Sequence, residues 1–100
     1  MTVYLIAQLK FTDRAAYDRY QPRFFSVFKR FNGRLLAADE SPRVVEGLWP
    51  RDKLVMMSFP DEAEADRFAT DPDYVEISKD RKAGADAVVL MVKGFSHQPR

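Results

Sequence analysis

The chain has 100 residues, 46% of them hydrophobic, a size that fits one compact domain with a core of its own. Its 16 Lys and Arg residues nearly balance its 15 Asp and Glu residues, and the formal net charge of +1 disfavours nucleic acids and anionic membranes as partners. Because the chain has no cysteine, disulfides, thiol nucleophiles and thiolate metal sites are excluded, which fits a reducing compartment.

The first predicted element is a strand over residues 3–10. Gln8 and Lys10 interrupt its apolar run, which is far shorter than the ~20 apolar residues that span a bilayer, and no basic leader precedes it. We therefore expect a soluble, cytoplasmic protein. Thr12 or Asp13 then accepts a hydrogen bond from the first amides of a helix.

The helix that follows is expected to carry one buried aromatic stripe. Pro22 interrupts the pattern and should kink the helix or begin its second half, because proline has no amide hydrogen. Gly33, after Asn32, can take the left-handed conformation that ends a helix. Apolar residues three and four positions apart form the stripe: Tyr17, Tyr20, Phe24, Val27, Phe28 and Phe31.

A hairpin is predicted in the middle of the chain. Its first strand covers residues 34–40 and resumes at residues 44–47, and Pro42 places this strand at a sheet edge because proline cannot donate to a ladder. Residues 48–52 form the turn, and residues 53–59 are the antiparallel return strand.

Two short helices and a final strand complete the predicted order. Asp61 and Glu64 form a D-x-x-E cap for a helix that ends near Thr70, and Asp73 with Glu76 caps the next. That second helix carries Tyr74, Ile77 and Arg81 and stops at Gly84. The last strand covers residues 86–93, so that residues 1–95 form a single domain and residues 96–100 a flexible tail.

The order of strand, helix, strand, strand, helix, strand predicts an α+β, ferredoxin-like βαββαβ fold with a four-stranded antiparallel sheet. Three strand segments, residues 3–7, 54–57 and 87–92, are apolar at odd and even positions alike, so both faces of the sheet should be buried. The helices cover one face. An internal cavity or a second copy must cover the other, and a symmetric homodimer with sheet against sheet is the simplest arrangement.

Six short motifs in this order and spacing connect the chain with a known family: Tyr17-Asp18-Arg19-Tyr20, Phe31-Asn32-Gly33-Arg34, Glu46-Gly47-Leu48-Trp49-Pro50, Phe59-Pro60, Asp71-Pro72-Asp73-Tyr74 and Arg81. The chain resembles the DUF1330 family of small bacterial domains of unknown function, within the dimeric α/β-barrel group. Phe68 stands where the family often has Trp, and Asn32 stands where it often has Gly. The resemblance implies a ferredoxin-like subunit that pairs into a barrel and implies no particular reaction.

Glu46 is the candidate acid or base, since its apolar neighbours suggest partial burial that would raise its pKa; the alternative is a glutamate that faces water or pairs with an arginine. Arg81 shares a helix face with Tyr74, so it is expected to hold an anion or to pair with Glu46, unless it is solvated within its charge run. Together, Tyr74 and Arg81 are candidate ligand-binding residues.

Tyr20 and Arg23 flank Pro22 and would converge on a small organic acid, although such a tyrosine also suits a core. Trp49 either covers a pocket or anchors a dimer interface. His97 is the only histidine, so the sequence predicts no metal site, and its use as a haem ligand or general base is the less favoured reading.

We therefore expect a homodimer that binds a small organic or aromatic acid between sheet and helices, with no metal or cofactor. By analogy with other dimeric α/β barrels, it would be a metal-free isomerase or a cofactor-free oxygenase. The alternative is a noncatalytic dimerisation or ligand-sensing module, which a filled core with paired Glu46 and Arg81 would favour. RNA binding is disfavoured because residues 54–57 lack the aromatic side chains of RNA-recognition strands.

Overall fold

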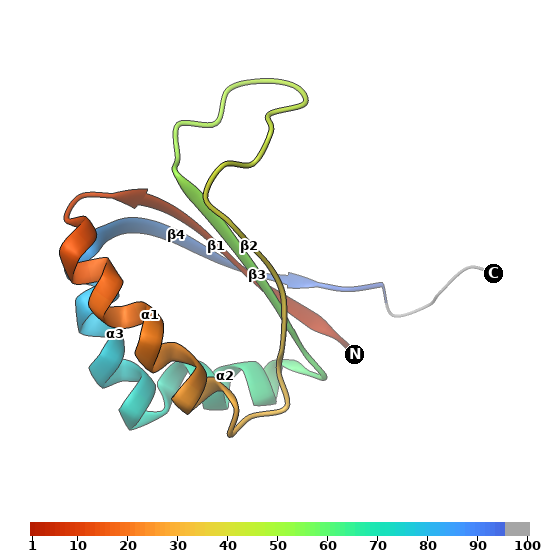
Figure 1. Ribbon diagram of the computed structural model, residues 1–100. Coiled ribbons are helices and arrows are strands. Elements are labelled where there is room, and N and C mark those ends of the chain that lie inside the picture. Colours follow the sequence, from red (N-terminus) through yellow and green to blue (C-terminus); the bar gives the residue numbers. More distant parts are fainter. Residues whose placement is uncertain (96–100) are drawn as a thin grey trace.

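The computed structural model describes residues 1–95 and shows an antiparallel sheet with its helices together on one face (Figure 1). The elements are β1 Val3–Phe11, α1 Arg14–Phe28, β2 Arg34–Asp39, β3 Lys53–Phe59, α2 Glu62–Thr70, α3 Pro72–Gly84 and β4 Ala85–Lys93. This order confirms the predicted α+β, ferredoxin-like fold with a four-stranded sheet. The predicted tail, with His97, lies outside the described residues.

The strands lie in the order β2-β3-β1-β4, so β1 is central and β2 is an edge strand as predicted. The return strand β3 also has its predicted bounds, Lys53–Phe59. The prediction that β2 resumes at residues 44–47 is wrong, because residues 40–52 form a loop that projects beyond the sheet (Figure 1). Gly47 has a φ of 92°, in the left-handed region that a strand does not use.

Each helix begins at an aspartate whose side chain accepts amide hydrogen bonds. Asp13 caps α1 and Asp61 caps α2, as predicted. For α3 the predicted cap at Asp73 is wrong: Asp71 accepts from the amides of Asp73 and Tyr74, at 3.0 and 3.2 Å. Pro72 explains the difference, since proline fits the first helical position and the cap precedes it.

The first helix passes through Pro22 without interruption and ends at Phe28, so Pro22 does not begin a second helical segment, and Phe31 lies beyond the helix. The carbonyl of Asp18 loses one helical hydrogen bond at Pro22, but both residues are exposed, so water can satisfy that carbonyl. Tyr20 and Phe24 of the predicted stripe are buried.

Gly33 and Gly84 serve close packing. The left-handed helix end predicted at Gly33 is wrong, because only Gly47 has a positive φ among the described glycines, whereas α3 stops at Gly84 as predicted. A Cβ atom on Gly33 would lie 2.7 Å from the ring of Phe28. A Cβ atom on Gly84 would lie 2.7 Å from the carbonyl oxygen of Asp13. Both glycines let neighbouring elements approach more closely than any side chain allows.

The main core lies between the sheet and the helices. Alternate strand residues such as Leu9, Met57 and Phe59 point into it and are buried. The intervening residues form the opposite face of the sheet, which no element of residues 1–95 covers (Figure 1). Within this described part of the chain, no helix is long and apolar enough to cross a bilayer.

Candidate functional site

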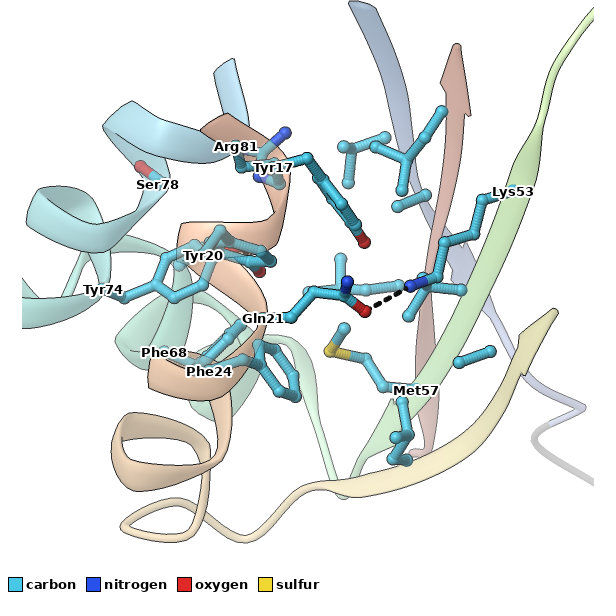
Figure 2. A pocket seen from close by; sticks show the side chains of 18 of the residues that line it. Tyr17, Tyr20, Gln21, Phe24, Lys53, Met57, Phe68, Tyr74, Ser78 and Arg81 are labelled. Atoms are coloured by element: carbon cyan, nitrogen blue, oxygen red, sulfur yellow. Dashed lines mark hydrogen bonds between the residues drawn. The ribbon is translucent and has the colours of Figure 1, made fainter. Parts of the chain in front are cut away.

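A pocket of about 300 Å³ lies between the helical layer and the sheet (Figure 2). From α1 it is lined by Tyr17, Tyr20, Gln21 and Phe24, whose spacing of three and four residues places them on one helix face. The volume is at the lower end of the range of about 300–1,000 Å³ that holds small molecules.

The other walls come from α3 and the sheet. Tyr74, Ser78 and Arg81 recur along one face of α3, and Lys53 and Met57 share the helix-facing side of β3. The ring centroids of Tyr74 and Phe68 are 4.3 Å apart, which makes the helical wall largely aromatic. A flat, apolar ligand body suits such a wall.

The charged groups on the pocket wall all have one sign. Lys53, Arg81 and Lys82 line the pocket, and no Asp or Glu is among the residues that line it. Coulombic attraction between unlike charges is stronger in a partly buried site than in water. The wall therefore favours a negatively charged ligand over a neutral or positively charged one.

Lys53 is the most deeply buried of these cations, with a side chain that is only 7% exposed. Its Nζ donates to Oε1 of Gln21 at 3.1 Å and lies 4.9 Å from the ring centroid of Tyr17 (Figure 2). A lysine ammonium has three N–H donors, so the single hydrogen bond to Gln21 leaves two donors for another acceptor.

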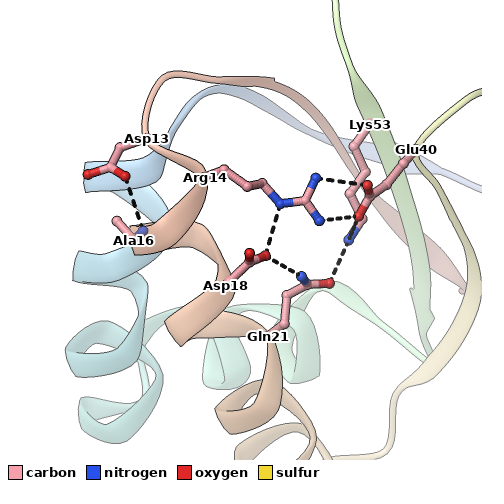
Figure 3. A network of polar contacts seen from close by, with 7 residues as sticks. All are labelled: Asp13, Arg14, Ala16, Asp18, Gln21, Glu40 and Lys53. Atoms are coloured by element: carbon pink, nitrogen blue, oxygen red, sulfur yellow. Dashed lines mark hydrogen bonds and ion pairs between the residues drawn. The ribbon is translucent and has the colours of Figure 1, made fainter.

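A polar network at one end of the pocket connects Lys53 with the start of α1 (Figure 3). Arg14 donates to both carboxylate oxygens of Glu40 at 2.8 Å and to Asp18 at 2.9 Å. These hydrogen bonds from Arg14 hold the pKa of Glu40 and of Asp18 below their usual values. Glu40 forms an ion pair with Lys53 at 3.7 Å, beyond hydrogen-bond distance, so no carboxylate of residues 1–95 accepts a hydrogen bond directly from Lys53.

Tyr20 and Tyr74 meet on the helical wall, where their hydroxyl oxygens are 3.0 Å apart. Burial of the Tyr20 phenol, and then its contact with Tyr74, raises its pKa well above the usual value near 10. Tyr20 is thus a neutral hydrogen-bonding phenol near neutral pH. Only one of the two O–H hydrogens can lie between the two oxygens, so the other is available to a third group.

Arg81 contributes a guanidinium with an unsatisfied donor. Its Nε is buried and has no hydrogen-bond partner, and no carboxylate of residues 1–95 forms an ion pair with Arg81. A buried donor without an acceptor costs about 1–3 kcal/mol, more when it is charged. An acceptor that reaches Arg81 would remove this cost.

The structure brings together three of the six residues predicted as a site. Tyr20, Tyr74 and Arg81 all line the pocket. Arg23 does not, because its side chain is 60% exposed on the outer side of α1 and approaches Asp80 at 4.0 Å. The expected convergence of Tyr20 and Arg23 is therefore wrong.

Glu46 and Trp49 lie in the loop of residues 40–52, away from the pocket lining. Glu46 is exposed, so the expected strand position and partial burial are wrong, and within residues 1–95 it forms no ion pair with Arg81. The Trp49 indole donates to Oε1 of Gln8 at 3.0 Å. Because Gln8 lies on the uncovered face of the sheet, this bond places Trp49 beside that face.

Sequence reasoning missed Tyr17, Gln21 and Lys53 as pocket residues. The signal for Lys53 was its register: it alternates with Val55 and Met57, so it shares the helix-facing side of β3 with them. Tyr17 and Gln21 follow from the same helical face as Tyr20. A charged residue at the start of a strand is usually exposed, so the burial of Lys53 was not to be expected from the sequence.

Comparisons with known proteins agree with this architecture. The chain superimposes on the RPA0582 protein of unknown function from Rhodopseudomonas palustris with a TM-score of 0.78 at 19% identity, over 96% of this chain and 84% of that one. It also resembles a dimeric ferredoxin-like protein of unknown function from Jannaschia sp. CCS1, with a TM-score of 0.71 at 13% identity over 94% and 100% of the two chains.

A third similar structure is SnoaB, a cofactor-independent oxygenase from Streptomyces nogalater, with a TM-score of 0.70 at 11% identity over 99% of this chain and 98% of that one. These low identities establish the fold alone. Among curated proteins, no relative matches the sequence significantly. The profile of the family described as "Domain of unknown function (DUF1330)" matches residues 2–95. The chain therefore belongs to the DUF1330 family.

Proposed function

We propose that the protein is a homodimer in which each subunit binds a small organic acid, with an aromatic body, in the pocket between sheet and helices. The observation that supports this function best is the positive charge of the pocket wall. Lys53, Arg81 and Lys82 line the pocket, and no carboxylate is among the lining residues. The aromatic side chains on α1 and α3 provide the apolar surface for the ligand body.

The proposal of a dimer rests on the uncovered face of the sheet. Across the register, Met56, Ile6 and Leu90 form one row of directly opposed residues. Leu54 and Val88 flank Gln8 in the next row, where the indole of Trp49 adds to the face. Apolar side chains on three adjacent strands form a continuous patch, as expected of an interface. A second copy that pairs sheet to sheet would bury the patch, and the dimeric ferredoxin-like neighbour supports this arrangement.

Isothermal titration calorimetry with 2-naphthoate and its uncharged counterpart 2-naphthamide tests the acid preference. The two probes share a ring system and differ in charge, so the wild-type protein should bind the acid and bind the amide at least about tenfold more weakly. Equal affinity for the two probes, or no binding of the acid, would contradict the proposed function.

A second candidate function is oxygenation of a bound aromatic acid without a cofactor. SnoaB, a protein of similar fold, is a cofactor-independent oxygenase. The fold and the aromatic pocket favour it over isomerisation. The residues that line the pocket include no Asp, Glu or His, and Glu46 lies outside the lining, so the pocket supplies no carboxylate or imidazole base of its own. Oxygen consumption by the wild-type protein with hydroxynaphthoates would support this function. A protein that binds these acids and consumes no oxygen would be the noncatalytic ligand-sensing module.

A further inference from the structure

The pocket offers hydrogen-bond donors on two opposite walls. Figure 2 shows Lys53 entering from the sheet, whereas Arg81, Tyr20 and Tyr74 come from the helices. On the sheet wall Lys53 keeps two unused N–H donors. On the helical wall the Nε of Arg81 has no acceptor among residues 1–95. A ligand with oxygen atoms at one end only would satisfy only one of these walls.

The two walls differ in the acceptor that each suits. Arg81 has a planar guanidinium that can bind a carboxylate through two parallel hydrogen bonds, and no carboxylate of residues 1–95 neutralises its charge. Lys53 already donates to the Gln21 amide and lies 3.7 Å from a Glu40 oxygen, so part of its charge is balanced within the chain. Arg81 is therefore the stronger anion site, and Lys53 suits a neutral carbonyl or hydroxyl oxygen.

We propose that the pocket selects aromatic acids that carry a second oxygen function remote from the carboxylate, as in hydroxyaryl or oxoaryl carboxylic acids. The carboxylate binds Arg81 on the helical wall, where the spare O–H hydrogen of the Tyr20–Tyr74 pair adds a donor. The remote oxygen accepts from Lys53 on the sheet wall. This inference rests on the proposed function, because it specifies the class of acid that the same pocket binds.

Two pairs of probes test the second contact: benzoate with 4-hydroxybenzoate, and 2-naphthoate with 6-hydroxy-2-naphthoate. Within each pair the acids differ only in the remote hydroxyl group, and the two pairs differ in the distance between hydroxyl and carboxylate. Wild-type protein should bind the hydroxy acid of at least one pair about tenfold more tightly, as expected for one hydrogen bond to a charged donor. Calorimetric titration measures both affinities.

Variants separate the two walls. Lys53→Met should abolish the preference for the hydroxy acid, because it removes the donor to the remote oxygen while Met keeps most of the apolar stem. Arg81→Met should weaken both acids about tenfold or more without lowering the melting temperature, since it removes an unsatisfied buried donor. Lys79→Met is the control: Lys79 is an exposed cation on the same helix that does not line the pocket, so this variant should change neither the preference for the hydroxy acid nor the affinity for either acid by more than about twofold.

The outcomes distinguish the inference from the proposed function. If wild-type protein binds none of the four acids, the proposed function fails. If it binds them but shows no preference within either pair, or if the preference survives in Lys53→Met, the two-wall inference is wrong and acid binding stands. If Lys79→Met weakens the acids as much as Arg81→Met does, the effect is diffuse electrostatic attraction, and the assignment of the carboxylate to Arg81 is wrong.

Discussion

Gly84 shows how a single missing side chain positions the pocket. Its carbonyl accepts from the amides of Thr12 and Asp13 at 2.9 and 3.1 Å, which joins the end of α3 to the start of α1. The two helices carry most of the polar pocket residues, so their separation sets the width of the helical wall. The close approach at Gly84 fixes that separation at one end.

Gly84→Ala is expected to destabilise the fold by about 1–3 kcal/mol, because the added Cβ meets backbone atoms that cannot move aside. Urea unfolding followed by circular dichroism measures the change. Lys82→Ala, an exposed position two residues earlier on the same helix, is the control and should change the free energy of unfolding by less than about 0.5 kcal/mol. Equal effects of the two substitutions would show that the close approach is not tight.

Tyr20 should make the stability of the fold decrease with pH in the alkaline range. Its pKa is raised in the folded state by burial and by Tyr74, so folding keeps the phenol protonated. The stabilising contribution is complete below the unfolded-state pKa near 10 and declines as the pH rises above that value. Between pH 10 and 11.5, wild-type protein should lose up to about 1.4 kcal/mol per pH unit more than Tyr20→Phe does. If the unfolding free energies of the two proteins change equally with pH over this range, the raised pKa of Tyr20 is wrong.

At the level of the elements, Asp71 joins the start of α3 to the segment that follows α1. Its side chain accepts from the first amides of α3, and Arg30, which follows α1, donates to it at 2.7 Å. This cap orients the first turn of α3, which carries Tyr74 into the pocket.

Asp71→Ala should therefore cost about 1–2 kcal/mol, the typical loss when a helix cap is removed. Asp73→Ala is the matched control, since Asp73 is exposed and is not the cap, and it should cost no more than about 0.5 kcal/mol. Thermal and urea unfolding of the two variants compares them directly. A larger loss of stability for Asp73→Ala than for Asp71→Ala would show that Asp73 is the cap of α3, as the D-x-x-E pattern predicts.

The strands and helices were predictable because local rules decide them. Alternation and the apolar run placed β3 at Lys53–Phe59, and aspartate caps marked the starts of α1 and α2. The loop of residues 40–52 was not predictable in the same way: Val44 and Val45 favour a strand by composition, yet both are exposed in the loop. Whether an apolar residue finds a partner depends on tertiary or quaternary packing, which local patterns do not contain.

The pocket was predictable in part. Tyr74 and Arg81 share a helical face, so their common position follows from spacing. Lys53 was not recognised, because its burial depends on Gln21 and Tyr17 across the pocket, contacts between residues more than 30 positions apart in sequence. Glu46 was placed wrongly because its burial was inferred from neighbours that turned out to be exposed.

At the level of the whole molecule, the uncovered sheet face predicts the oligomeric state. Leu90 is 45% exposed at the centre of β4, directly opposite Ile6 on the neighbouring strand. Wild-type protein should sediment as a dimer at micromolar concentration, and Leu90→Glu should shift it to the monomer by placing a charge within an apolar interface.

Val75→Glu is the control for this substitution. Val75 is 46% exposed, almost the same as Leu90, but it lies on α3 in the helical layer. This variant should remain a dimer. Sedimentation velocity distinguishes the species, and a wild-type protein that sediments as a stable monomer would refute sheet-to-sheet pairing.

The most direct measurement of the central claim is amide NMR mapping of the bound acid on wild-type protein titrated with 2-naphthoate. The proposed site predicts saturable shift changes grouped on α1 around Tyr20 and Gln21, on α3 around Arg81 and on β3 around Lys53. Shift changes confined to the opposite face of the sheet, or no saturable change at all, would contradict the claim that this pocket binds an organic acid.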